Sequence, residues 1–180
     1  MEGVREAVGD PDVALMLRVG SGDEAAFAAL VHRHQQPLLN FFARMGAATD
    51  GDDLVQETFV RLYRYRAHYR PAARFVTFLY HLARHVWADR GRKLGRYKRL
   101  VTAWEAESLG DGPSAPPCPG RTMDVQAALD RLSPKLREVI VLNVYQGLRY
   151  QEVADVLGIP LGTVKSRINL ALAALKESLQ

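Results

Sequence analysis

Cysteine is almost absent from this 180-residue sequence, and long apolar runs are absent altogether. The single cysteine, Cys118, excludes an internal disulfide framework and a zinc site built from cysteines. No apolar run approaches the ~18 residues of a membrane-spanning helix. The acidic N-terminus, MEGVREAVGD, lacks the apolar core of a signal peptide. The sequence therefore predicts a cytoplasmic protein that does not insert directly into a membrane.

Motifs of common active sites and cofactor sites are also missing. The sequence has no Walker-type phosphate loop and no GxSxG motif, and the pair Gly20-x-Gly22 lacks the third glycine of a dinucleotide-binding loop. His81 and His85 have a spacing that suits metal ligands, but no third ligand is evident. We expect no enzyme activity, no cofactor and no metal site.

Strand-like alternation is lacking as well, and a helical period dominates the chain. Helices are expected over 12–19, 24–44, 52–69, 74–92 and 134–146, followed by two short helices within 150–172. Four prolines and three glycines fall within residues 110–120, a composition that favours a flexible linker. We predict an all-α fold with two small helical domains, at 10–94 and 123–180, joined by a Pro/Gly-rich linker at 95–122.

The net charge of +4 hides an uneven distribution. Residues 1–60 carry four basic and ten acidic side chains, whereas residues 61–100 carry twelve basic side chains and one acidic one. Arginines alternate with tyrosines in this basic block, a composition typical of proteins that bind single-stranded nucleic acid. A solvated cationic face is the alternative interpretation.

Residues 150–172 have the spacing of a helix-turn-helix. Val153, Leu157, Val164 and Ile168 are expected to face inward, and Gly158 supplies the left-handed residue at the turn. The second helix of such a motif enters the major groove of DNA. An ordinary helical hairpin is the alternative interpretation.

Acidic and amide side chains cluster at the start of the helix expected over 52–69. Asp52, Asp53, Gln56 and Glu57 share one polar surface at helical spacing. Carboxylates at this end of a helix match its macrodipole, so the residues alone leave two interpretations open: a solvated helix start or a docking surface.

Two sets of motifs resemble extracytoplasmic-function (ECF) sigma factors of the sigma-70 family. GDEAAFAALVHRH, DDLVQETFVRLYR and FVTFLYHLARHVWADRGRK resemble the second-region domain, and GIPLGTVKSR resembles the fourth-region domain. The resemblance covers nearly the whole chain apart from the linker and about ten N-terminal residues. It implies a factor that binds core RNA polymerase, melts and reads the −10 promoter element, reads the −35 element, and is inhibited by an anti-sigma factor.

The resemblance also implies roles for individual residues. Core polymerase is expected to bind Asp52, Asp53, Gln56 and Glu57. The loop 66–74 resembles the family loop that captures a flipped base, with Tyr69 as its aromatic and Arg61 lining its pocket. The residues expected to contact the −10 element are Arg61, Tyr69, Arg70, His81, Arg84, His85, Arg92 and Lys93. Those expected to contact the −35 element are Tyr150, Gln151, Thr163, Lys165, Ser166, Arg167 and Asn169.

The sequence departs from the family after Ile168, where further arginines are usual. Leu170 and Leu172 stand there instead, which predicts either a weaker grip on the −35 element or a protein contact. Three other functions are alternatives: a conventional helix-turn-helix regulator, a helical RNA-binding or adaptor protein, and an enzyme. The first and second leave part of the pattern unexplained, and the third lacks a convergent set of catalytic residues.

Overall fold

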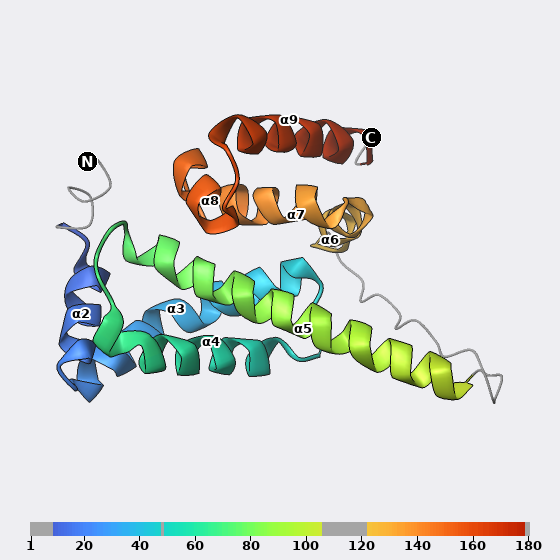
Figure 1. Ribbon diagram of the computed structural model, residues 1–180. Coiled ribbons are helices and arrows are strands. Elements are labelled where there is room, and N and C mark those ends of the chain that lie inside the picture. Colours follow the sequence, from blue (N-terminus) through green and yellow to red (C-terminus); the bar gives the residue numbers. More distant parts are fainter. Residues whose placement is uncertain (1–8, 48, 106–121, 179–180) are drawn as a thin grey trace.

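The computed structural model describes residues 9–47, 49–105 and 122–178, and every regular element in these ranges is helical (Figure 1). The prediction of an all-α fold is therefore confirmed. The first domain contains α2 (Pro11–Gly20), α3 (Glu24–Met45), α4 (Gly51–Tyr65), the 3-10 turn η1 (Arg66–His68) and α5 (Phe75–Glu105). The second contains α6 (Thr122–Arg131), α7 (Pro134–Ile140), the π-helical turn η2 (Val141–Tyr145), α8 (Tyr150–Leu157) and α9 (Leu161–Ser178).

Local side-chain and glycine signals set several of the helix ends. The carboxylate of Asp23 accepts the N–H of Ala26 at 2.9 Å and caps α3. Gly46 ends the same helix at φ +103°, and Gly158 ends α8 at φ +64°, both in the left-handed region that favours glycine. Pro37 lies inside α3, which nevertheless continues to Met45.

Two expectations from the sequence are wrong. Helix α5 continues to Glu105, well into the segment 95–122 that was expected to be linker, because the next proline is Pro113 and most residues before it are good helix formers. In the regular helix expected over 134–146, Val144 would continue the buried apolar stripe of Val139 and Ile140, but it is 55% exposed. The chain forms a π turn at Val141–Tyr145, which changes the helical register that the expectation assumed. Cys118 and the Pro/Gly-rich stretch 110–120 lie outside the described residues.

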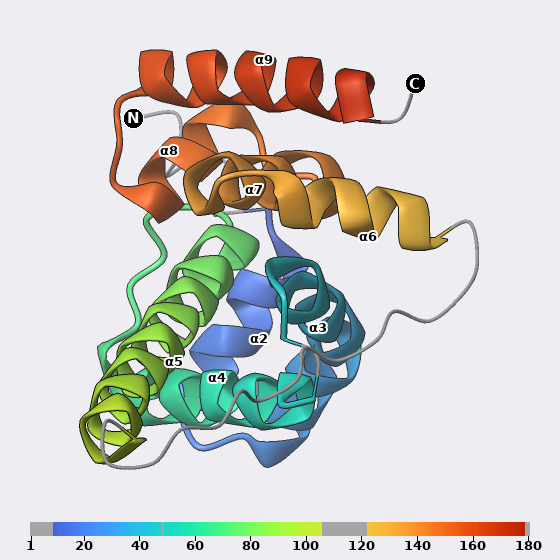
Figure 2. The same ribbon diagram turned by 90° about the vertical axis from the view of Figure 1, so that its right-hand side faces the viewer.

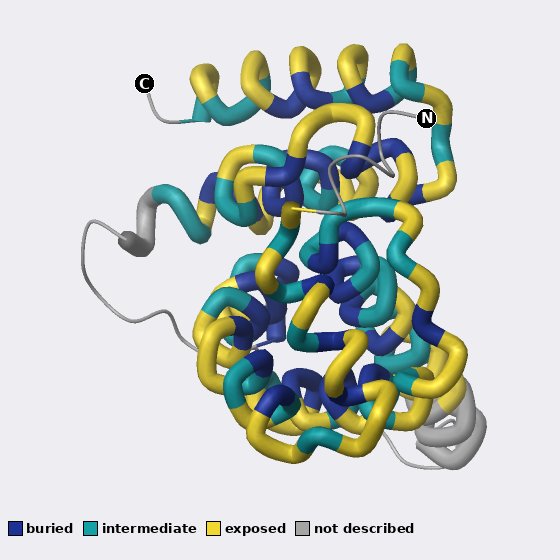
Figure 3. The backbone as a smooth tube through the Cα atoms, turned by 90° about the vertical axis from the view of Figure 1, so that its left-hand side faces the viewer, coloured by how far each residue is buried: buried dark blue, intermediate teal, exposed yellow. Residues whose placement is uncertain are grey.

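The two domains pack on each other in layers. Helix α9 lies over α7 and α8, these lie over α3 and α5, and α4 lies on the opposite side of the molecule (Figures 1 and 2). The first domain buries a core of large apolar side chains, including Phe41, Phe42, Leu62, Phe75 and Leu79. Figure 3 shows buried stretches on the inward side of α9 and exposed stretches on its outward side.

The helix-turn-helix packs as the sequence predicts. Val153, Leu157, Val164 and Ile168 are buried between α8, α9 and the neighbouring helices. Ala154 is also buried, and its small side chain fits the close approach of the two helices. Removing an apolar side chain from this contact costs the transfer energy of its atoms together with a cavity term.

Ile168→Ala should therefore lower the free energy of unfolding by about 2–5 kcal/mol, because Ile168 is 1% exposed. Leu170→Ala is the matched control on the same helix, since Leu170 is 61% exposed and should change stability by less than ~0.5 kcal/mol. Urea unfolding followed by circular dichroism measures both values. Similar losses for the two variants would contradict the orientation of α9.

Candidate functional site

The four residues expected to bind polymerase form an exposed ridge along the first half of α4. Asp52, Asp53 and Gln56 are exposed and Glu57 is half-buried. The ridge separates two hollows. Asp52 and Gln56 line one between α3 and α4, and Asp53 and Glu57 line the other between α4 and α5. The structure thus brings these four side chains together on one acidic surface, which we call the α4 ridge.

Ion pairs tie the α4 ridge to α5. Arg61 donates to Glu57 at 2.7 Å and to Asp89 of α5 at 2.8 Å. Arg90 pairs with Asp50 at the start of α4 and holds the pKa of that carboxyl below its usual value. These arginines link the two helices as well as adding to the positive charge of residues 61–100.

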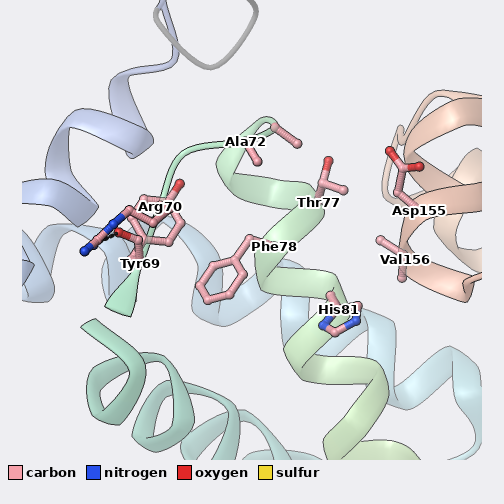
Figure 4. A pocket seen from close by; sticks show the side chains of 9 residues that line it. Tyr69, Arg70, Ala72, Thr77, Phe78, His81, Asp155 and Val156 are labelled. Carbon is pink, nitrogen blue, oxygen red and sulfur yellow. Dashed lines mark hydrogen bonds between the residues drawn. The ribbon is translucent and has the colours of Figure 1, made fainter. Parts of the chain in front are cut away.

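Arg61 and Tyr69 are not brought together. Arg61 lines the hollow between α4 and α5, whereas Tyr69 lines a different pocket of about 190 Å³ beside the loop after η1 (Figure 4). The first domain contributes Tyr69, Arg70, Ala72, Ala73, Thr77, Phe78 and His81 to this pocket, which we call the Tyr69 pocket. Asp155 and Val156 of α8 form its opposite wall.

The ring of Tyr69 is held inside the protein. It is 4% exposed and packs against Phe78, with 5.0 Å between the ring centroids. Its hydroxyl is buried and has no hydrogen-bond partner. Burial, with a smaller effect of the Asp10 charge, raises the pKa of Tyr69 to about 12, so the hydroxyl is a neutral donor without an acceptor.

The expected DNA-contacting face of α5 is partly covered by the second domain. The rings of His81 and His85 lie 4.4 Å apart, and burial lowers the pKa of His81, helped by the charges of His85 and Arg84. Arg84 is half-buried and donates to Glu138 of α7 at 3.0 Å. Further from α8, the side chains of His85, Arg92 and Lys93 are exposed, as is that of Arg70 on the loop.

The expected −35 residues form a mostly exposed surface on α8 and α9. Tyr150, Gln151, Lys165, Ser166 and Asn169 are exposed. Gln151 donates to Asp155 at 3.0 Å, and Ser166 donates to the carbonyl of Thr163 at 3.1 Å.

Arg167 and Thr163 are less accessible than the other residues expected to contact the −35 element. Their side chains are half-buried, and the Arg167 charge acts on Glu138.

Two residues that the sequence did not single out are central to the site. Glu152 of α8 is only 7% exposed, and its carboxylate accepts the N–H of Arg149 at 2.7 Å. Glu138 accepts from Arg84 as described above. A glutamate at the third position of a helix is a recognisable capping signal. The partners of Glu152 in the first domain lie 75 and 78 residues away, so no local pattern could have predicted them.

Metal-ligand clusters and membrane-spanning helices are both absent from the described part of the chain. In that part no three His, Cys, Asp or Glu side chains are placed to hold a metal ion together. No helix in the described ranges is long and apolar enough to cross a membrane.

Family models match both domains. The model for sigma-70 region 2 matches residues 30–97, and the model for sigma-70 region 4 matches residues 122–175. Among solved structures, CnrH in complex with the cytosolic domain of CnrY has a TM-score of 0.71 at 30% identity, covering 94% of this chain and 97% of that one. The sigma factor RpoE in complex with the anti-sigma factor NepR from Bartonella quintana has the same TM-score at 25% identity, covering 85% and 96%.

Proteins of similar sequence are also described as sigma factors. The ECF sigma factor SigE of Mycolicibacterium smegmatis is 32% identical over 88% of this chain, which spans 65% of that protein. RNA polymerase sigma-H factor of Pseudomonas aeruginosa is 33% identical over 95% of both chains, and the ECF sigma-E factor of Escherichia coli K12 is 32% identical over 94% of both. Both sigma regions are matched, and two relatives above 30% identity are covered over nearly their whole length. The chain therefore belongs to the ECF family of sigma factors, the initiation factors that direct RNA polymerase to promoters.

Proposed function

We propose that this sigma factor uses three separate surfaces to bind core polymerase and the two promoter elements. The α4 ridge binds core polymerase, the Tyr69 pocket and the adjoining face of α5 open and read the −10 element, and α8 with α9 reads the −35 element. The observation that carries the proposal is the separation of the first two surfaces. Helix α4, which carries the acidic ridge, lies on the side of the first domain away from α8 (Figure 2). The Tyr69 pocket instead borders α8, and Arg84 pairs with Glu138 of α7.

The chemistry of each surface suits its partner. Carboxylates on the α4 ridge complement a basic protein surface and steer its approach. Arginine, histidine and tyrosine around the Tyr69 pocket suit a single-stranded backbone and its unstacked bases. Lys165, Ser166 and Asn169 project from the first half of α9, where the second helix of a helix-turn-helix reaches base edges and phosphates.

We also propose that the factor has an inhibitory protein partner and no catalytic activity of its own. Two similar structures are complexes, CnrH with the cytosolic domain of CnrY and RpoE with the anti-sigma factor NepR. Their similarity supports an anti-sigma factor for this chain. Its action on polymerase and DNA would place it in the cytoplasm.

Run-off transcription with core polymerase and a genomic promoter library tests the function as a whole. Transcripts that start downstream of a shared two-part motif are the expected result. Binding to duplex DNA without core polymerase, and no core-dependent transcripts, would support a conventional helix-turn-helix regulator instead.

Charge reversal on the α4 ridge tests the polymerase surface. Asp52→Lys with Asp53→Lys should weaken core binding by about tenfold or more, because both carboxylates are exposed and would face a basic partner. Glu57 is left unchanged because it also holds Arg61. Fluorescence anisotropy with labelled sigma factor measures the affinity for core.

Glu24→Lys is the control for that double variant. Glu24 is also an exposed acid in the first turn of a helix of the same domain, so its reversal disturbs the helix dipole similarly. It should leave core affinity within about twofold. An equal loss in both variants would remove the α4 ridge from the polymerase interface.

Two substitutions at Tyr69 separate ring stacking from hydrogen bonding. Tyr69→Phe keeps the ring and removes a hydroxyl that has no partner, so stability should stay the same or rise by up to ~1 kcal/mol. Tyr69→Leu removes the ring and should reduce open complexes by about 5- to 150-fold, the equivalent of ~1–3 kcal/mol of base stacking. Permanganate reactivity of the −10 region measures melting, at a core concentration that saturates each variant. Equal effects of Phe and Leu would contradict a stacking role.

A further inference from the structure

A polar cavity of about 400 Å³ lies between α3, the first turns of α5 and the end of η2. Three side chains on one face of α3 form one wall: Arg33, Asn40 and Arg44. Tyr145 and Gln146 of the second domain, which lies over α3 and α5, form the opposite wall (Figure 2). The size falls within the ~300–1,000 Å³ range of small-molecule sites. We call this hollow the Arg44 cavity.

The described wall of the Arg44 cavity contains no acidic side chain. Each of the other three hollows described above has at least one. These are Asp155 in the Tyr69 pocket, Asp52 between α3 and α4, and Asp53 with Glu57 between α4 and α5. A concave site that is lined by cations without carboxylates attracts anions.

Arg44 supplies a positive charge that pairs with no carboxylate among the described residues. Arg44 is half-buried, and its guanidinium lies over the ring of Tyr145, 3.7 Å from the centroid. A contact at this distance uses the flat face of the guanidinium. Its N–H groups lie in the plane of the group, so they stay free to donate to an acceptor in the cavity.

Two amide side chains in the wall are oriented as donors. The side-chain oxygen of Asn40 accepts from Gln36 at 3.1 Å, and that of Gln146 accepts from the hydroxyl of Tyr80. These bonds occupy the oxygen of each amide and leave its NH₂ group, which carries two donors. Neither NH₂ group has a partner among the described residues, so both are available to a ligand.

Arg33 adds a second positive charge to the α3 wall. One of its nitrogens donates to Asp12 at 2.6 Å, and its side chain is 51% exposed. A guanidinium has five N–H donors, so this single ion pair leaves most of them available. Asp12 also pairs with His34 and is not part of the cavity wall.

The cavity therefore offers donors to a ligand from two sides. A phosphate group suits them better than a carboxylate, because it has three acceptor oxygens and up to two charges. We propose that the Arg44 cavity binds a small phosphorylated molecule, with its phosphate held by Arg44, Asn40 and Gln146. Val76 in the wall gives the organic part an apolar contact. None of these residues belongs to the polymerase or DNA surfaces proposed above.

Isothermal titration calorimetry of the full chain tests the site with two phosphate esters, AMP and glucose 6-phosphate. At least one ester should bind with a Kd below about 1 mM. Adenosine and glucose should give no measurable binding, because the phosphate supplies most of the affinity. Inorganic phosphate should bind more weakly than the better ester, because it lacks the organic part.

Arg44→Gln should weaken binding of the better ester by about tenfold or more, because it removes the unpaired charge. Arg66→Gln is the matched control. Arg66 is also half-buried and lies over a tyrosine ring, 3.9 Å from the centroid of Tyr63, but it is not part of the cavity. It should change the Kd by less than about twofold. Far-UV circular dichroism confirms that both variants remain helical.

Asn40→Asp is a second variant that does not disturb the contact between Arg44 and Tyr145. It keeps the shape of an exposed side chain and places a carboxylate in the wall, so binding should weaken by about tenfold. Gln35→Glu adds the same charge to the same helix, but Gln35 is exposed and lines the hollow toward α4. This control should keep the affinity within about twofold.

Three results would overturn the proposal. The first is no binding of either ester to the wild type, or equal weakening by each variant and its control. The second is inorganic phosphate that binds as tightly as both esters, because the cavity would then hold a free ion. The third is weaker binding of a forked promoter DNA by Arg44→Gln when no ester binds, which would assign Arg44 to a DNA phosphate. Run-off transcription decides the proposed function separately.

Discussion

The arrangement of the two domains depends on the hydrogen bonds that the Glu152 carboxylate accepts across the domain boundary. This side chain is almost fully buried, and within its own domain it accepts the N–H of Arg149. Arg74 and Thr77 supply the remaining contacts across the domain boundary. Separating the domains returns all three groups to water, so the net cost is far smaller than the strength of the contacts suggests. The charged contacts of this interface therefore add less to stability than their number suggests.

Ion pairing also reduces how much of the positive charge in residues 61–100 is available to a partner. Arg61 and Arg90 face carboxylates within the first domain, and Arg74 and Arg84 face carboxylates of the second. Half-buried pairs of this kind align helices more than they add stability. A count of charges along the sequence therefore overstates how much of the block is presented to DNA in this arrangement.

Short-range features of this fold could be predicted from the sequence and long-range ones could not. The cap at Asp23, the end at Gly158 and the inward face of α9 follow from residues within a turn of each other, and the structure agrees. The exposed position of Val144 depends on a π turn, and no residue type in the sequence predicts such a turn. The partners of Glu152 depend on how two domains meet, which the helical period does not encode.

The covered and uncovered surfaces of the two domains also bear on the order of binding. Asp52, Asp53 and Gln56 on the α4 ridge remain exposed while the Tyr69 pocket and Arg84 are covered by α7 and α8. On the proposed assignment of surfaces, core polymerase could reach the α4 ridge in this arrangement before promoter DNA could reach the Tyr69 pocket and Arg84.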